Sequence, residues 1–312
     1  GIVSFISSGK FFEASYGIPL LSLLVEKSQI IEVIDFKDLN VFEGISAYPL
    51  ILIFKSIKEP VNYNFNYKDA TKLKFNHLNE VVQDIIFEKI NITDFISNDY
   101  KFIDSFISSI ISKMNKNSLT LVDFGFLPLV GVKTGLNDGF TNLESEFAKD
   151  YIFGRNIKKY GSLVPETNIF FPYSFHKDKY ELIDENTPEL GKLNCRGKLE
   201  KRAIIKDGII NGSKKWYEFQ QLNKTLNFEK EYIIYPNVSL GNNFTLSIGN
   251  IIDMTGFIIP SNSKYLLSIL NSKLISFFME LYAISRRGGY LEYKTQYVSK
   301  IPIKKIDEKN QL

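Results

Sequence analysis

The path of the chain is most constrained at residues 131–140, where three glycines and an Asn-Asp pair follow one another closely. The sequence of this decamer is Gly-Val-Lys-Thr-Gly-Leu-Asn-Asp-Gly-Phe. Glycine adopts positive φ values and lets a backbone approach a partner closely. Lys133 and Thr134 lie between two of the glycines, so we expect a cation and a hydroxyl on an exposed bend, where they suit a phosphate or a base edge. By itself this decamer favours a simpler interpretation, a tight turn joining two strands.

The decamer does not match a Walker phosphate loop. That motif needs glycine directly before the Lys-Ser/Thr pair and another glycine five positions earlier, whereas Val132 and Leu127 occupy these positions. The chain also lacks a Gly-x-Gly-x-x-Gly stretch after a strand, a Pro-Pro dipeptide and a Pro-Asp dipeptide. The sequence therefore predicts no catalytic residues and no dinucleotide site.

Composition narrows the class of protein further. A chain of 312 residues with 44% hydrophobic and 23% charged residues is typical of a globular protein of two domains. One cysteine, Cys195, and two histidines, His77 and His176, exclude an internal disulfide and make a metal site improbable, so we expect no metal and a reducing, cytoplasmic setting. The apolar stretch 266–281 is interrupted by polar residues, so we expect no membrane span.

The order of apolar runs predicts an α+β fold in three parts. Residues 1–58 alternate strand and helix: 2–7 is expected as a buried strand, 11–27 as a helix, and 30–36 and 50–54 as strands, which resembles the end of a doubly wound, Rossmann-like sheet without its first four strands. Residues 59–118 are expected as a helical spacer. Residues 119–312 are strand-rich, with short strands that include 203–205, and carry a C-terminal helix after Ser263.

Basic residues gather in three clusters of the last part. The stretch 192–217 has eight basic and two acidic residues, a net charge of +6, and ends beside Trp216. Two smaller clusters, each beside a glycine and a tyrosine, are Arg155 with Lys158 and Lys159, and Arg286 with Arg287. Cations neutralise phosphates and read base edges, and interleaved aromatics suit close approach to nucleic acid, although any one cluster could equally be a solvated face. The candidate DNA-binding residues are Lys133, Thr134, Arg155, Asn156, Lys158, Lys159, Arg196, Lys198, Arg202, Lys214, Lys215, Trp216, Arg286 and Arg287.

Several of these stretches, in this order, resemble the TaqI-like target-recognition (specificity) domain. The decamer resembles its opening loop, and the other motifs follow along residues 119–303. Those motifs are Gly-Arg-Asn-Ile-Lys-Lys-Tyr at 154–160, Lys-Trp-Tyr-Glu-Phe at 215–219, Leu-Asn-Ser-Lys-Leu at 270–274, Gly-Gly-Tyr-Leu-Glu-Tyr at 288–293 and Ile-Pro-Ile at 301–303. The resemblance implies a domain that recognises double-stranded DNA.

Residues 1–55 resemble the end of an adenine-specific DNA methyltransferase domain. The stretch 8–17 resembles the segment after its fifth strand, and 35–54 its last hairpin. In that hairpin the family places an aromatic residue that stacks on the flipped adenine, and Phe42 falls at the matching position; the alternative is a core residue of the hairpin. The resemblance implies S-adenosylmethionine as the cofactor of a longer protein, together with Mg²⁺ if a nuclease domain is present, and no cofactor for this chain.

The sequence thus predicts the specificity part of a type IIG restriction-modification enzyme of phage defence that methylates adenine, in a chain without catalytic activity of its own. The partner predicted is double-stranded DNA. Two alternatives remain open at this point: a protein-interaction module of a defence complex, in which the basic faces meet an acidic protein, and an RNA-binding module.

Overall fold

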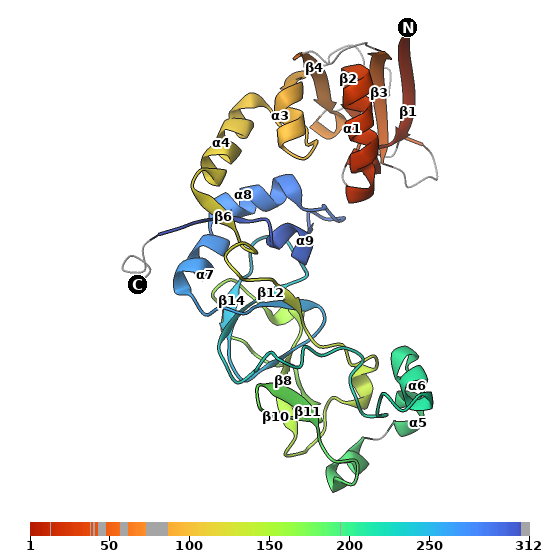
Figure 1. The fold of residues 1–312 in the computed structure, drawn as a ribbon, viewed down its shortest axis with the longest axis vertical. Coiled ribbons are helices and arrows are strands. Elements are labelled where there is room, and N and C mark those ends of the chain that lie inside the picture. Colours follow the sequence, from red (N-terminus) through yellow and green to blue (C-terminus); the bar gives the residue numbers. More distant parts are fainter. Residues whose placement is uncertain are drawn as a thin grey trace. The chain divides into compact units, whose positions relative to one another are not determined.

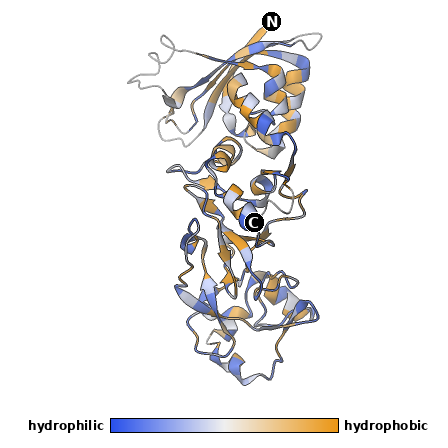
Figure 2. Ribbon diagram, turned by 90° about the vertical axis from the view of Figure 1, so that its left-hand side faces the viewer, coloured by the Kyte–Doolittle hydropathy of each residue, from blue (hydrophilic) through white to orange (hydrophobic). Residues whose placement is uncertain are grey.

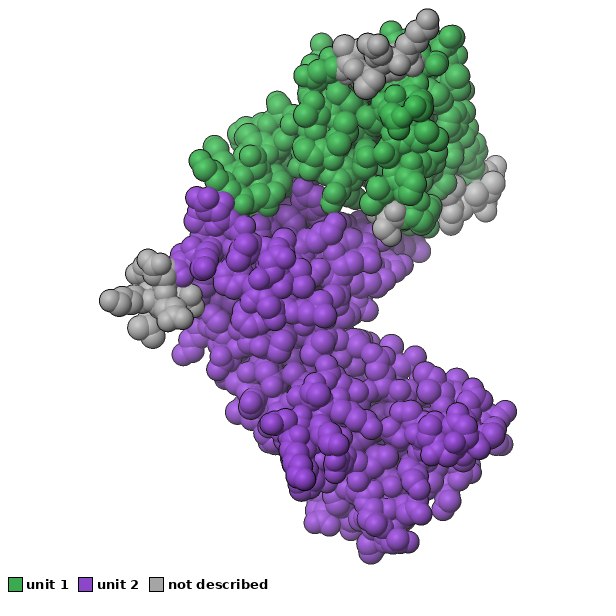
Figure 3. Space-filling model, in the orientation of Figure 1, with its two compact units in different colours: residues 1–116 green, residues 117–312 purple. Residues whose placement is uncertain are grey.

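A computed structural model of the chain describes residues 1–12, 14–37, 39, 41–42, 48–56, 62–72, 87–193 and 195–306. It divides into two compact units, Gly1–Lys116 and Asn117–Leu312 (Figure 3). The predicted α+β class is confirmed, with 29% helix and 30% strand spread over several small sheets.

The first unit is built on a five-stranded mixed sheet with the strand order β1-β3-β2-β4-β5 (Figure 1). Strand β3 runs antiparallel to both β1 and β2, so β1 and β2 point the same way and helix α1 connects them. Strand β4 pairs parallel with β2 and antiparallel with β5. The strands are β1 (Ile2–Ser8), β2 (Ser28–Asp35), β3 (Pro49–Ser56), β4 (Asn64–Asp69) and β5 (Glu88–Asn91).

Three helices accompany this sheet. Helix α1 (Ile18–Lys27) has proline in its first turn, and α3 (Ile92–Ser97) and α4 (Ser105–Asn115) begin at Asn91 and Asp104, whose side chains accept backbone N–H groups of the first turn. Short 3-10 turns precede α1 and follow β4, namely η1 (Gly9–Phe12), η2 (Ser15–Gly17) and η3 (Ala70–Lys72). The core between helices and sheet includes Leu21, Ile30, Leu52, Phe65 and Phe95, all buried.

Two expectations for this unit need correction. Strand β1 is not buried: every residue of it is exposed, Ile2 to 70%, because β1 is the outer strand of the sheet and pairs on one side only. Figure 2 shows hydrophobic residues in orange near the N-terminus. Residues 59–118 are not only helical, since β4 and β5 join the sheet. Phe65, Tyr67 and Ile90 alternate with polar residues and bury their side chains, a strand pattern within a polar stretch.

The second unit consists of small sheets joined end to end. The largest has the order β14-β12-β16-β7, the next is β15-β8-β9, and the pairs β10-β11, β13-β17 and β18-β6 complete the set. The strands are β6 (Ser118–Thr120), β7 (Leu129–Val130), β8 (Ala148–Ile152), β9 (Thr167–Phe170), β10 (Tyr173–His176), β11 (Lys179–Leu182), β12 (Tyr232–Pro236), β13 (Val238–Ser239), β14 (Thr245–Ser247), β15 (Ile251–Ile252), β16 (Gly256–Ile259), β17 (Leu291–Glu292) and β18 (Pro302–Lys304).

Helices in the second unit occupy its connections. The expected strand 203–205 is wrong, since these residues begin helix α6, which turns Ile205 and Gly208, three residues apart, toward the interior. Among the described helices, none is long and apolar enough to cross a membrane. The helices and 3-10 turns are η4 (Asn137–Gly139), η5 (Gly154–Asn156), η6 (Pro188–Lys192), α5 (Arg196–Leu199), α6 (Ala203–Ile210), α7 (Lys264–Leu270), α8 (Lys273–Tyr282) and α9 (Thr295–Val298).

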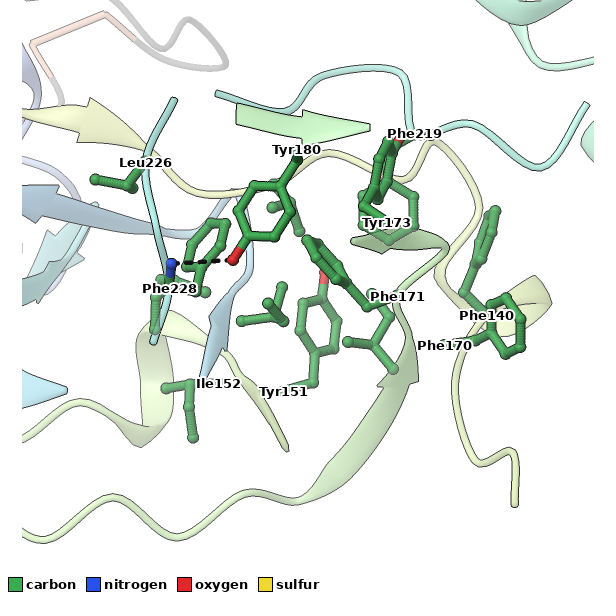
Figure 4. Close-up of a cluster of buried hydrophobic side chains, with 14 of the residues drawn as sticks. Phe140, Tyr151, Ile152, Phe170, Phe171, Tyr173, Tyr180, Phe219, Leu226 and Phe228 are labelled. Carbon is green, nitrogen blue, oxygen red and sulfur yellow. Dashed lines mark hydrogen bonds between the residues drawn. The ribbon is translucent and has the colours of Figure 1, made fainter. Parts of the chain in front are cut away.

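An aromatic core holds the strand-rich part together. Phe171 lies within 6.0 Å, ring centre to ring centre, of Tyr173, Tyr180, Phe219 and Phe228 (Figure 4). The buried hydroxyls have partners: the Tyr180 oxygen accepts the Phe228 N–H at 3.1 Å and that of Tyr173 accepts the Phe219 N–H at 2.7 Å. These rings therefore pack as an apolar layer and also fix the backbone of the loops that cross it.

Candidate nucleic-acid interface

The decamer is partly buried: Gly131, Val132, Thr134, Gly139 and Phe140 are buried, whereas Gly135 and Asp138 are exposed. Its backbone crosses between two segments, since Val132 N–H donates to Ile252 O and Lys133 exchanges two backbone hydrogen bonds with Gln221. Thr134 is buried and its hydroxyl donates to Asn137 Oδ1 at 2.5 Å while accepting the Leu136 N–H. The expected exposed bend is therefore corrected for Thr134, because its hydroxyl has protein partners and no access to solvent.

Close approach explains the first glycine of the decamer. A Cβ at Gly131 would lie 2.2 Å from the carbonyl oxygen of Asp253, and this distance is too short for any residue with a side chain. The Asp253 carboxylate accepts hydrogen bonds from Thr255 and, at 2.7 Å, from the Tyr151 hydroxyl. The glycine thus lets the decamer pack on a buried polar turn, and this stretch positions the loops around it.

Arg202, one of the predicted DNA contacts, is buried. Each guanidinium nitrogen donates inside the protein, and the acceptors are the backbone carbonyls of Thr134, Leu199, Trp216 and Glu218. Burial lowers the pKa of Arg202 to about 10, so the side chain is still charged at neutral pH. Arg202 therefore ties helices α5 and α6 to the decamer and has no donor group directed at a ligand.

Six further candidates have an acidic partner. Arg155 pairs with Glu166, and the Asn156 amide donates to the same carboxylate at 2.7 Å. The other ion pairs are Arg196–Glu200, Lys214–Glu218, Lys215–Glu185 and Arg286–Glu292. The Arg196 guanidinium also lies over the ring of Trp216, 4.8 Å from its centre. Carboxylates therefore pair with four of the eight basic residues of 192–217, namely Lys192, Arg196, Lys214 and Lys215.

The remaining basic candidates form no ion pair with a described acidic residue. Lys158, Lys198 and Arg287 are exposed, and no described acidic residue forms an ion pair with them. Lys159 donates to the carbonyl oxygen of Asn271 at 2.6 Å, and Lys133 is half-buried. Exposed cations without an acidic partner are the ones best placed to meet an anion.

Three loops of the second unit adjoin one another and carry Lys158, Lys159 and Arg287, and we call them the three-loop surface: residues 158–161, 239–243 and 286–290. Asn243 joins the first two, because its side-chain oxygen accepts the Lys159 N–H at 3.0 Å and its amide donates to Ser239 at 2.8 Å. Pairing of β13 with β17 holds the second loop beside the third. The three loops contain Lys158, Lys159, Arg286 and Arg287 and no acidic residue.

Two of the three basic clusters thus come together. Sequence reasoning did not select Asn243, Leu240 or Glu166. Asn242-Asn243 after Gly241 is a turn signal, but its position against Lys159 depends on a contact across 84 residues.

The motif residue Asn271 has a structural explanation. It is buried between α7 and α8, and its amide side chain forms two hydrogen bonds with the backbone N–H and carbonyl of Phe244. The helix pair is thereby fixed to the loop that carries Asn243. Asn271 thus helps to position the three-loop surface.

Phe42 lies on the connector between β2 and β3, at a bend, and is 41% exposed. Residues 43–47 of the same connector are outside the described residues. The stacking role of Phe42 stays a prediction.

Comparison with known families identifies the class of the second unit. The sequence model of the TaqI-like C-terminal specificity domain matches residues 149–303, so this part of the chain is such a domain. All the motifs quoted above except the decamer fall in the matched segment, and the resemblance proposed from them is confirmed. No curated protein matches the chain.

Two solved structures are similar to the chain. One is the type IIL restriction-modification enzyme MmeI in complex with DNA, with 13% sequence identity and a TM-score of 0.53 over 96% of this chain. The other is the type IIG restriction endonuclease BpuSI, with 9% identity and a TM-score of 0.42 over 99% of this chain. The chain spans 38% and 41% of their respective lengths. At this identity the likeness to MmeI establishes the fold alone.

Proposed function

We propose that this chain is the DNA-recognition part of a bacterial restriction-modification enzyme and that it binds double-stranded DNA through the three-loop surface. The observation that carries the proposal is the charge of that surface. Four cations lie on three adjoining loops of a specificity domain, and the loops themselves contain no acidic residue. Arg286 pairs with Glu292 next to its loop, whereas Lys158 and Arg287 form no ion pair with a described residue. Loops supported by a rigid scaffold are where binding residues concentrate.

The geometry of the third loop supports a phosphate partner. Gly288 and Gly289 both have positive φ values, +81° and +78°, so the loop presents its backbone without side chains next to Arg287. Arg286 N–H donates to the Tyr290 carbonyl at 2.7 Å and closes the loop. A backbone exposed beside cations can approach the sugar-phosphate chain of DNA closely.

We further propose that the first unit is the end of an adenine-specific DNA methyltransferase domain in a longer protein. The apolar outer strand β1 supports this, because a sheet edge with exposed Ile2, Val3 and Phe5 is stabilised when further strands and a covering layer join it. S-adenosylmethionine would bind to that further part, since the motifs that hold it are not in this chain. Catalysis, and Mg²⁺ with any nuclease domain, belong to the longer protein.

A salt titration tests DNA binding. Fluorescence anisotropy with a labelled mixed-sequence duplex, between about 50 and 200 mM salt, should give a log–log slope near −5 if about six phosphates are neutralised. Lys158→Ala combined with Arg287→Ala should reduce the magnitude of the slope by about two and weaken binding roughly tenfold. Lys230→Ala is the matched control, because Lys230 is an exposed lysine flanked by Glu229 and Glu231.

Absence of duplex binding at low salt would refute the proposal. Tighter binding of single-stranded RNA than of duplex DNA would favour an RNA-binding module. Capture of an acidic protein that survives nuclease treatment, with no DNA affinity, would favour a protein-interaction module.

Phe42→Ala tests the methyltransferase assignment in the longer protein. If Phe42 stacks on a base that has left the duplex, its removal should lower the methylation rate more than the affinity for DNA. Methylation assays and anisotropy on the same variant separate the two effects. An unchanged methylation rate would exclude the stacking role.

A further inference from the structure

The three-loop surface carries exposed apolar side chains as well as cations. Leu240 is 63% exposed, Tyr160 is 56% exposed and Tyr290 is 41% exposed. Single exposed apolar residues are ordinary on protein surfaces. Here they occur on the same three loops as Lys158 and Arg287, so apolar side chains and unpaired positive charge share one surface.

Leu240 lies on a loop that is supported from both sides. Ser239 belongs to β13 and pairs with Leu291 of β17, and Asn243 accepts a hydrogen bond from the backbone of Lys159. A methyl group at Gly289 would lie 3.9 Å from Leu240 Cδ2, so the glycine of the third loop lies beside the leucine. Only residues 240–242 lie between these two supports, so the position of Leu240 is fixed.

The supports also place an aromatic ring on each neighbouring loop. Tyr160 N–H donates to the Phe244 carbonyl at 3.1 Å, directly after Asn243. The Tyr290 ring lies over Gly288, where an added Cβ would be 3.7 Å from it. Leucine with tyrosines on the adjoining loops is a combination of an apolar wedge with stacking surfaces.

We propose that Leu240 inserts into a base step of the bound duplex, with the cations of the three-loop surface on the flanking phosphates. The proposal rests on the proposed DNA function and goes beyond it, since it assigns a duplex-opening role to one side chain. An opened step presents apolar base faces between two phosphate chains, which complements an apolar residue surrounded by cations.

Binding to a pre-opened duplex tests the role of Leu240. A mixed-sequence duplex is compared, by anisotropy, with the same duplex carrying a central mismatch and with one of its single strands. Because a mismatched step is already weakened, the intact chain should bind the mismatched duplex about tenfold more tightly than the paired one. Leu240→Ala should bind both duplexes equally, and Leu240→Met should keep the preference.

Two further variants sharpen the comparison. Leu240→Asn keeps the size of the side chain and should lose the preference as Leu240→Ala does. Ile248→Ala removes an equally exposed apolar side chain, 61% exposed, outside the three-loop surface, and should keep it. Trp216 emission compares the folding of all variants, since Trp216 is the single tryptophan.

The outcomes separate the two proposals. Equal affinity of the intact chain for both duplexes overturns the insertion of Leu240 and leaves DNA binding in place, as does a preference that survives in Leu240→Ala and Leu240→Asn. Tighter binding of the single strand than of the mismatched duplex also overturns it. Binding to none of the three probes overturns the proposed function itself.

Discussion

Arg202 illustrates how a cation can serve the fold. Its guanidinium donates to four backbone carbonyls that are otherwise enclosed, so Arg202→Met would leave buried acceptors without donors. We expect the free energy of unfolding of the second unit to fall by about 3 kcal/mol. Urea unfolding followed by Trp216 emission measures this. Arg287→Met, at an exposed position, should change it by less than about 0.5 kcal/mol.

Glu292 is buried and lies between two cations, Arg286 and Lys294, the latter 2.8 Å away. Burial raises the pKa of Glu292, but its hydrogen bonds to Lys294 and Arg286 outweigh burial and leave the pKa below 4.5. A carboxylate with a lowered pKa in the folded state stabilises the fold above pH 4.5, and this contribution is lost as the pH falls through the lowered pKa.

Glu292→Gln should therefore be less stable than the unaltered chain at neutral pH, and the difference should shrink below pH 4.5. Urea unfolding at a series of pH values measures the difference. A stability difference that stays constant down to the acid limit would show that Glu292 is not ionised in the folded protein.

At the scale of elements, the decamer depends on one close contact. Gly131→Ala would place a methyl group 2.2 Å from the Asp253 carbonyl, and the strands on either side would have to separate. We expect a loss of stability of at least about 3 kcal/mol. Gly197→Ala is the control, since nothing lies within 4 Å of a Cβ there and it belongs to helix α5. That change should be neutral or stabilise by about 0.5–1 kcal/mol.

For the whole molecule, the exposed outer strand β1 is the feature from which we predict association. Its side chains Ile2, Val3, Phe5 and Ile6 are exposed, and an exposed apolar edge strand can pair with another chain. We expect this chain by itself to associate as its concentration rises. Val3→Lys should suppress the association, whereas Ile248→Lys, at an exposed position of the second unit, should not. Sedimentation velocity over a concentration series would contradict this if both variants behaved alike.

The sequence alone determined the class of the second unit. Short motifs at 154–160, 215–219 and 288–293 identify a specificity domain because they are local patterns read along the chain. The cap at Ser263 and the apolar stripe after it are also visible without coordinates, but the sequence predicts one helix there. The structure has two, α7 and α8, and Ser272 caps the second.

Only the tertiary structure shows which basic side chains are free to contact a partner. Arg155, Lys215 and Arg286 look like Lys158 and Arg287 in the sequence, yet the first three have carboxylate partners and Arg202 is buried. It also decided that β1 is exposed and that two basic clusters meet through Asn243. The physical reason is range: periodicity and capping act over a few residues, whereas ion pairing, burial and loop contact depend on distances between residues far apart in the chain.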